Sequence, residues 1–196
     1  RMMITLTDIP EDIEIEKNLM YNLLRCCCEE TQSSTEKHIK ENFFMEKVYT
    51  KSIRNVALLG HSGGGKTSLA ESMLYISRLT DRLGTVTDGN TVCDYDPEEI
   101  KRGYSISSAT APMLWNGTKI NILDTPGFFD FEVEVRQCVR VADAAIIVVD
   151  GKAGIEIGTE QAWYYAEQAN LPKAFFINKF DDNDARFAHV LDALHV

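Results

Sequence analysis

Gly60-His61-Ser62-Gly63-Gly64-Gly65-Lys66-Thr67 connects a short apolar run, residues 55–59, to a stretch of helical composition. A glycine-rich loop between a strand and a helix is typical of phosphate binding, because its backbone N–H groups point inward and the helix N-terminus adds positive potential. Lys66 can reach terminal phosphates, and the Thr67 hydroxyl can bind magnesium. A merely structural glycine turn would need neither side chain. We therefore expect nucleotide binding by His61, Ser62, Gly63, Gly64, Gly65, Lys66, Thr67 and Ser68.

Short apolar runs alternate with helical stretches from this loop onward. The runs that predict buried strands lie at 55–59, 120–123, 144–149 and 174–177. Stretches of helical composition lie between them, at 66–77, 132–142 and 159–170. Strands that alternate with helices form a mostly parallel sheet with helices on both faces. The sequence therefore predicts an α/β fold of three layers, in which ligands bind at the carboxyl ends of the strands.

Asp124-Thr125-Pro126-Gly127 directly follows the second predicted strand. A carboxylate at the carboxyl end of a strand can hold magnesium through water, and Gly127 can offer its backbone N–H to the last phosphate. Alone, the four residues are a common turn sequence. After a phosphate loop, we interpret them as a second part of a nucleotide site.

Asn178-Lys179-Phe180-Asp181 follows the last apolar run. A carboxylate there can accept hydrogen bonds from guanine N1–H and its 2-amino group, a donor pair that adenine lacks. Adenine would leave the carboxylate unpaired, so such a site discriminates strongly. As an isolated tetrapeptide the motif is weak, and a solvated turn is its alternative. As the third motif in order it predicts guanine binding by Asn178, Lys179 and Asp181.

Charge and hydropathy exclude some classes of function. The net charge of −10 leaves no basic surface for gripping nucleic acid directly. The longest apolar run, 144–149, is too short to cross a bilayer, and the first residues show no secretory pattern. We therefore expect no membrane partner and, by default, a cytoplasmic location.

Residues 1–44 differ in character from the rest, and we assign them to a separate helical extension, with the GTP-binding domain at 45–196. A capping acid near Asp8 and helical spacing up to Cys27 predict one amphipathic helix, and residues 35–44 predict a short polar one. The extension either packs on the domain or stays mobile, or it is a docking arm for a partner. Met45 is a plausible natural start, in which case the preceding residues are upstream sequence.

The order of these motifs, with Arg102-Gly103-Tyr104-Ser105-Ile106 between the first two, resembles the translational GTPases. Residues 54–194 are similar throughout to elongation factor G, and residues 94–102 look most like the divergent elongation factor G-like protein of some bacteria. Ribosomal protection proteins are near relatives, and membership of that group is an alternative that the resemblance leaves open. The resemblance implies the P-loop NTPase fold of a G domain, GTP or GDP with Mg²⁺ as ligands, and the ribosome as partner.

The same resemblance implies roles for residues around the phosphates. It places a first switch at 85–110, where Ser105 replaces a threonine that closes on magnesium and the last phosphate, and a second switch at 124–131. Phe128 stands where the family has a histidine that orients the attacking water, and Gly63 stands where many members have an aspartate. We therefore expect catalysis to involve Lys66, Ser105, Gly127 and Phe128, and magnesium to be held by Thr67, Ser105 and Asp124.

Three functions remain open at this stage. The first is a ribosome-stimulated GTPase, slow because Phe128 and Gly63 remove polar groups from the catalytic side. The second is a binding module in which GTP holds the switches in one conformation with little or no hydrolysis. A signalling or assembly GTPase is the third, although such a protein would lack the segment from Arg102 to Ile106. The family's final Ser-Ala motif does not occur before Val196, so we expect the G domain to be incomplete and translocation to need further domains.

Overall fold

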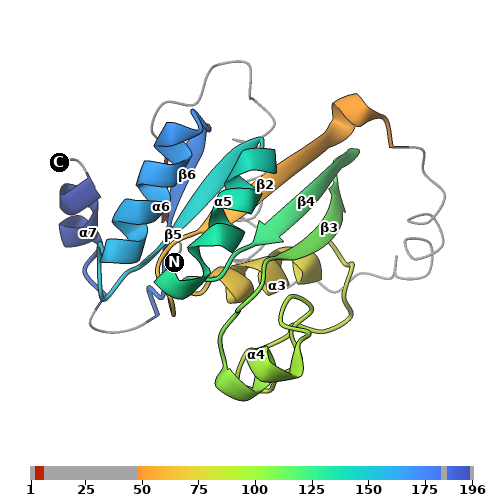
Figure 1. The fold of residues 1–196 in the computed structure, drawn as a ribbon, viewed down its shortest axis with the longest axis horizontal. Coiled ribbons are helices and arrows are strands. Elements are labelled where there is room, and N and C mark those ends of the chain that lie inside the picture. Colours follow the sequence, from red (N-terminus) through yellow and green to blue (C-terminus); the bar gives the residue numbers. More distant parts are fainter. Residues whose placement is uncertain (1–2, 7–47, 182–184, 195–196) are drawn as a thin grey trace.

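The structure is a computed structural model that describes residues 3–6, 48–181 and 185–194. Its centre is a sheet of six strands in the order β1-β6-β5-β2-β4-β3 (Figure 1). The strands are β1 (Met3–Leu6), β2 (Ile53–Leu59), β3 (Ala109–Trp115), β4 (Thr118–Asp124), β5 (Ala144–Asp150) and β6 (Lys173–Asn178). The helices are α3 (Lys66–Ile76), α4 (Pro97–Arg102), α5 (Glu132–Val141), α6 (Ile157–Gln168) and α7 (Phe187–Leu194), with short 3-10 turns at Thr50–Ser52 and Phe129–Phe131.

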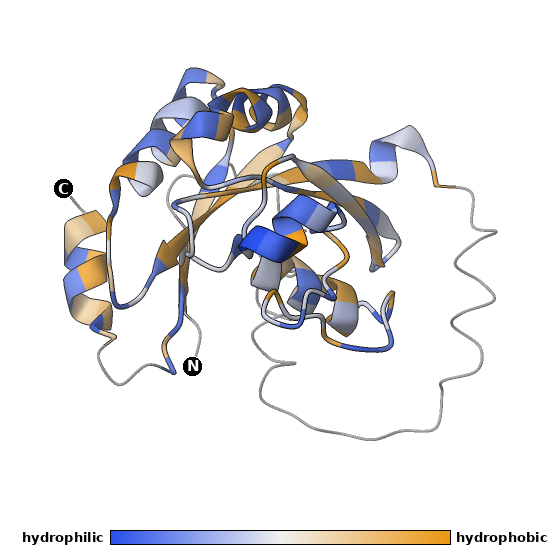
Figure 2. Ribbon diagram, turned by 60° about the horizontal axis from the view of Figure 1, so that its bottom comes forward, coloured by the Kyte–Doolittle hydropathy of each residue, from blue (hydrophilic) through white to orange (hydrophobic). Residues whose placement is uncertain are grey.

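The four inner strands run parallel, and the two edge strands pair antiparallel to their neighbours. Apolar side chains alternate between the faces of the sheet, so each face carries its own core. Leu58 belongs to the buried cluster that contains Met73 of α3. The next residue, Leu59, belongs to the cluster on the other face, with Val139 of α5 and Ala166 of α6. Helices therefore cover both faces, and hydrophobic residues, coloured orange, recur along the strands between them (Figure 2).

The strands and helices predicted from residue 55 onward are confirmed, with ends that agree or move by one or two residues. Each predicted strand lies within β2, β4, β5 or β6, and the predicted helices correspond to α3, α5 and α6. The α/β fold with a mostly parallel sheet is therefore confirmed. No helix among the described residues is long and apolar enough to cross a membrane.

The hairpin of β3 and β4 was not predicted in full, because β3 is not a continuous apolar run. Its residues alternate between buried and exposed positions, and the exposed Pro112 is tolerated because β3 is an edge strand. The signal for the hairpin was present in Asn116-Gly117, since both residues have positive φ, at 46° and 77°. Asn-Gly is the preferred sequence for such a two-residue turn.

Three further elements were missed. Met3–Leu6 pairs antiparallel with β6, from Met3 opposite Ile177 to Leu6 opposite Ala174, so part of the region assigned to a helical extension joins the sheet. Helix α4 has a local start signal, a capping box formed by Asp96 and Glu99, and α7 follows the predicted guanine motif. The helices expected between residues 8 and 44 lie outside the described residues, so they stay predictions.

Candidate nucleotide site

The glycine-rich loop between β2 and α3 lies at the carboxyl ends of the parallel strands, where two other motifs approach it closely. Gly65 has a φ of 95°, and a Cβ there would collide with the side-chain nitrogen of Asn178. A Cβ on Gly127 would lie 2.5 Å from Lys66 Nζ and 2.6 Å from Ser62 N. Both positions therefore need glycine, because backbone of one motif contacts atoms of the next. The structure thus brings all three predicted motifs together.

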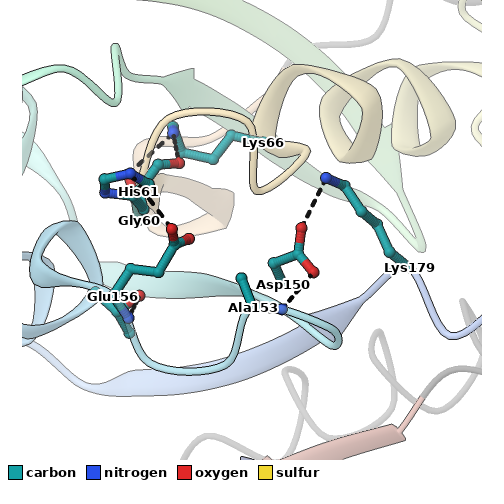
Figure 3. A network of polar contacts seen from close by, with 8 residues as sticks. Gly60, His61, Lys66, Asp150, Ala153, Glu156 and Lys179 are labelled. Carbon is teal, nitrogen blue, oxygen red and sulfur yellow. Dashed lines mark hydrogen bonds and ion pairs between the residues drawn. The ribbon is translucent and has the colours of Figure 1, made fainter. Parts of the chain in front are cut away.

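The Lys66 ammonium lies inside the loop. It donates hydrogen bonds to Gly60 O at 3.0 Å and to His61 O at 2.9 Å (Figure 3). Burial lowers the pKa of Lys66 to about 8, although the nearby Asp124 carboxylate acts in the opposite direction. The side chain is therefore a largely desolvated cation at neutral pH, which favours strong interaction with an anion that enters the loop.

Hydroxyl and carboxylate oxygens gather beside this lysine. Thr67 Oγ1 donates to Asp124 Oδ2 at 2.7 Å, and Ser105 Oγ donates to Asp94 Oδ1 at 2.7 Å. The two hydroxyl oxygens lie 3.3 Å apart. Each hydroxyl already donates its proton to a carboxylate. The lone pairs of the two hydroxyl oxygens are therefore directed toward each other. The predicted metal residues therefore form one cluster of oxygen acceptors.

This cluster has the chemistry that a hard cation requires. Asp124 is buried, and its Oδ1 has no hydrogen-bond partner among the described residues. Burial raises the pKa of Asp124 to about 6, against the hydrogen bond from Thr67 and the attraction of Lys66. A buried carboxylate oxygen without a partner costs free energy unless a cation or a water binds it. Oxygen ligands of this kind suit Mg²⁺, so the residues fit the ion that the sequence implied.

A cavity of about 440 Å³ opens in front of the loop and the oxygen cluster. Tyr104 and Phe128 line it from the first and second predicted switches, and their rings meet edge to face at 4.6 Å between centroids. The Tyr104 hydroxyl also accepts a hydrogen bond from Arg102 Nη1 at 3.1 Å. Phe128 is 40% exposed, so its ring lies at the rim of the cavity rather than in the core.

The predicted base-recognition motif lies at the end of β6. Asn178 Nδ2 donates to Gly64 O at 3.0 Å and so connects this motif to the phosphate loop. Lys179, with a φ of 60°, lines the cavity and forms an ion pair with Asp150 Oδ2 at 2.7 Å (Figure 3). The Asp181 side chain is exposed to solvent. The hydrogen bond between the two motifs brings the predicted base site and the predicted phosphate site to the same edge of the sheet.

A family model described as the elongation factor Tu GTP binding domain matches residues 51–196. The chain belongs to this family. It is therefore a GTP-binding domain, and the resemblance to the translational GTPases is confirmed. The match covers the phosphate loop, both predicted switches and the guanine motif.

Relatives with named functions agree with this assignment. "Ribosome-releasing factor 2, mitochondrial" of Drosophila virilis is 44% identical over 151 residues, which are 77% of this chain and 21% of that protein. The protein of the same name from Scheffersomyces stipitis is 45% identical over 138 residues, 70% of this chain and 16% of the relative. The GTP-binding domain thus spans about a fifth of the length of the curated relatives that it matches.

A solved structure supports the same fold. A crystal structure of a protein from Thermus thermophilus has a TM-score of 0.71 and 39% sequence identity, and the match covers 74% of this chain and 22% of that one. The likeness therefore extends to the sequence as well as to the arrangement of the elements.

The expected cytoplasmic location is wrong, because the named relatives carry a mitochondrial designation. The expectation rested on the lack of a secretory pattern and of a long apolar run. Neither feature distinguishes the cytoplasm from the interior of an organelle.

The His61 side chain lies apart from the cavity. Its Nε2 is 3.5 Å from Glu156 Oε1 at the start of α6 (Figure 3), and its Nδ1 is buried without a hydrogen-bond partner among the described residues. Gly158 packs against the same ring. Any contact of His61 with phosphates therefore comes through its backbone in this conformation.

Sequence reasoning missed two acidic residues of the site. Asp94 is buried, accepts the Ser105 hydroxyl and lines the cavity. Asp150, at the end of β5, accepts both Lys179 and the backbone N–H of Lys152. Asp94 carries no periodic signal, because it lies in an irregular segment before α4. Asp150 could have been found, since it directly ends a predicted strand at the ligand-binding edge of the sheet.

Proposed function

We propose that this GTP-binding domain binds GTP together with Mg²⁺ and hydrolyses it slowly as part of a factor that acts on the ribosome. The observation that supports the proposal best is the oxygen cluster beside the phosphate loop, in which the Thr67 hydroxyl contacts both the Asp124 carboxylate and the Ser105 hydroxyl. Among the described residues, Asp124 Oδ1 has no hydrogen-bond partner. The relatives named ribosome-releasing factor 2 suggest the ribosome as partner.

Each group of the chain has a separate task in this proposal. When GTP binds, the Lys66 ammonium donates to phosphate oxygens in place of the carbonyls of Gly60 and His61. The Gly127 N–H donates to the last phosphate. Thr67, Ser105 and Asp124 would hold Mg²⁺, which when bound would neutralise charge that develops on the phosphate oxygens. Catalysis then depends on positioning and on charge stabilisation by groups that are already in place. The rest of the loop around the phosphates is formed by His61, Ser62, Gly63, Gly64, Gly65 and Ser68.

Selectivity for guanine is the second part of the proposal. Asp181 accepts the two base donors, while Asn178 fixes the motif to the loop through Gly64. Lys179, which lines the cavity and is paired with Asp150, would contact the nucleotide from the same motif. When the base binds, the carboxylate loses its hydrogen bonds to water, and donors on the base must replace them. Only a base with the matching pair of donors therefore binds well.

Hydrolysis is expected to be slow because the second switch carries Phe128 beside the cavity. A phenyl ring neither accepts a proton nor orients water, and a positioned acid-base group typically contributes on the order of 10²–10⁴-fold to a rate. The contact between Phe128 and Tyr104 instead favours shielding of the last phosphate. This observation also supports the second candidate function, a GTP-dependent ribosome-binding module with negligible hydrolysis.

Single-turnover GTP hydrolysis with and without mitochondrial ribosomes tests the proposal and separates the two candidates. A slow rate that ribosomes accelerate supports the GTPase. Tight GTP-dependent ribosome binding without hydrolysis supports the binding module. Absence of both would contradict a role on the ribosome.

A further inference from the structure

Glu99 of α4 is hydrogen-bonded to both ends of the loop that carries Ser105. Its backbone carbonyl accepts the N–H of Gly103 at 2.8 Å. Its carboxylate Oε1 accepts the N–H groups of Ile106 at 2.8 Å and Ser107 at 2.9 Å. The residues from Gly103 to Ser107 therefore form a short loop whose beginning and end are both hydrogen-bonded to one amino acid, with Ser105 in the middle.

The burial of this carboxylate shows that it is part of the local architecture. Glu99 is 2% exposed, although glutamate is almost never fully buried unless it is paired. Its Oε2 also accepts the N–H of Asp96 at 3.3 Å, so backbone donors bind both oxygens. The Asp96 bond alone would complete the capping box of α4. The bonds to Ile106 and Ser107 go beyond helix capping and fix the chain after Ser105.

The closed loop determines where the Ser105 hydroxyl lies. Ser105 Oγ is 3.3 Å from Thr67 Oγ1 and donates to Asp94, whereas no regular element holds residues 103–107 in place. A segment without regular structure loses conformational entropy when a ligand orders it, and a segment that is ordered beforehand loses less. Hydrogen bonds from backbone N–H groups to a buried carboxylate are among the stronger ones in proteins.

We propose that Glu99 is a positioning residue that sets the preference for GTP over GDP by holding Ser105 ready for the ion and the last phosphate. This inference rests on the proposed function of Ser105. Glu99 itself does not line the cavity. Its influence passes through the backbone of Ile106 and Ser107 to the Ser105 hydroxyl.

Glu99→Gln tests the proposal, because it keeps the shape of the side chain and removes the charge. Binding of fluorescent GDP and of a fluorescent non-hydrolysable GTP analogue is measured in the full-length protein over a range of Mg²⁺ concentrations. The variant should bind the GTP analogue roughly tenfold more weakly, as expected for weakened buried hydrogen bonds, and should need more Mg²⁺. GDP affinity should stay within about twofold, since GDP lacks the phosphate that Ser105 approaches.

Two comparisons make the result specific. Glu98→Gln is the matched control, because Glu98 lies on the same helix but is exposed and pairs with Arg102 at 2.7 Å. It should leave both affinities unchanged. In a Ser105→Ala background, Glu99→Gln should cause little further loss, because residues that act through one another are not additive.

Equal losses of GTP-analogue and GDP affinity would overturn the proposal, because they indicate a general loss of structure. Unchanged binding of both nucleotides would overturn it as well. A full additional loss in the Ser105→Ala background would show that Glu99 does not act through Ser105. If the native protein binds neither nucleotide, the proposed function fails first and this inference with it.

Discussion

Asp124→Asn should stabilise the metal-free domain while it abolishes Mg²⁺-dependent GTP binding. Burial raises the pKa of this carboxyl from 3.8 to about 6 in the folded protein. A difference of about two units corresponds to about 3 kcal/mol of folding free energy that is lost near neutral pH, where the group is ionised. Asparagine carries no charge, but its amide still leaves a buried polar atom without a partner, which costs about 1 kcal/mol. The net gain in unfolding free energy is therefore about 2 kcal/mol.

The pH dependence of this gain follows from the sign of the shift. The folded pKa lies above the unfolded one, so the folded protein keeps the proton to a higher pH. Burial of Asp124 therefore lowers the free energy of unfolding only slightly below pH 3.8 and by its full amount above about pH 6. Urea unfolding is measured with EDTA and without nucleotide. The free energy of unfolding should be clearly higher for the variant near neutral pH, and the difference should fall to roughly a third of that value at about pH 5. Asp130→Asn, an exposed carboxyl of the second switch, is the matched control and should change little.

The second half of the experiment concerns binding. With Mg²⁺ present, native GTP-analogue affinity should depend on the ion, and the variant's affinity should not. A variant that is less stable near neutral pH, or whose gain is the same at both pH values, would refute the reasoning about the buried charge. Retained Mg²⁺-dependent binding would refute the assignment of Asp124 to the ion.

Two other substitutions test the base and the second switch. Asp181→Asn should weaken GDP binding and shift preference toward xanthine nucleotides, whose 2-oxo group accepts a hydrogen bond, and calorimetry with GDP and XDP measures this; an unchanged preference would contradict base recognition by Asp181. Phe128→His should accelerate ribosome-stimulated hydrolysis in the full-length protein by roughly tenfold or more with nearly unchanged GDP affinity. A native rate that histidine does not improve would show that another residue places the water.

The sequence predicted the parts of the fold that depend on buried parallel strands. The strand from Ala144 to Asp150 is buried on both faces over nearly its whole length, and its continuous apolar run is therefore visible in sequence. Strand β3 alternates buried and exposed side chains along part of its length, so the same criterion misses it. The short α4 was missed because its start depends on one local capping box rather than on periodicity.

The predictable part of the site is the part built from contiguous motifs. Lys66 and Thr67 follow from the glycine-rich loop, and Asp124 from its place at the end of a strand. Asp94 and Glu99 could not be inferred in this way, because their partners lie across an irregular segment and depend on how it folds back. The orientation of the histidine in the phosphate loop depends likewise on the packing of α6.

Calorimetry of the native protein with GDP and with ADP, both in the presence of Mg²⁺, tests the central claim most directly. The account predicts measurable GDP binding and ADP binding that is weaker by at least about a hundredfold, because adenine leaves the Asp181 carboxylate without its donor pair. Equal affinity for the two nucleotides would contradict the assignment of this domain to guanine nucleotides.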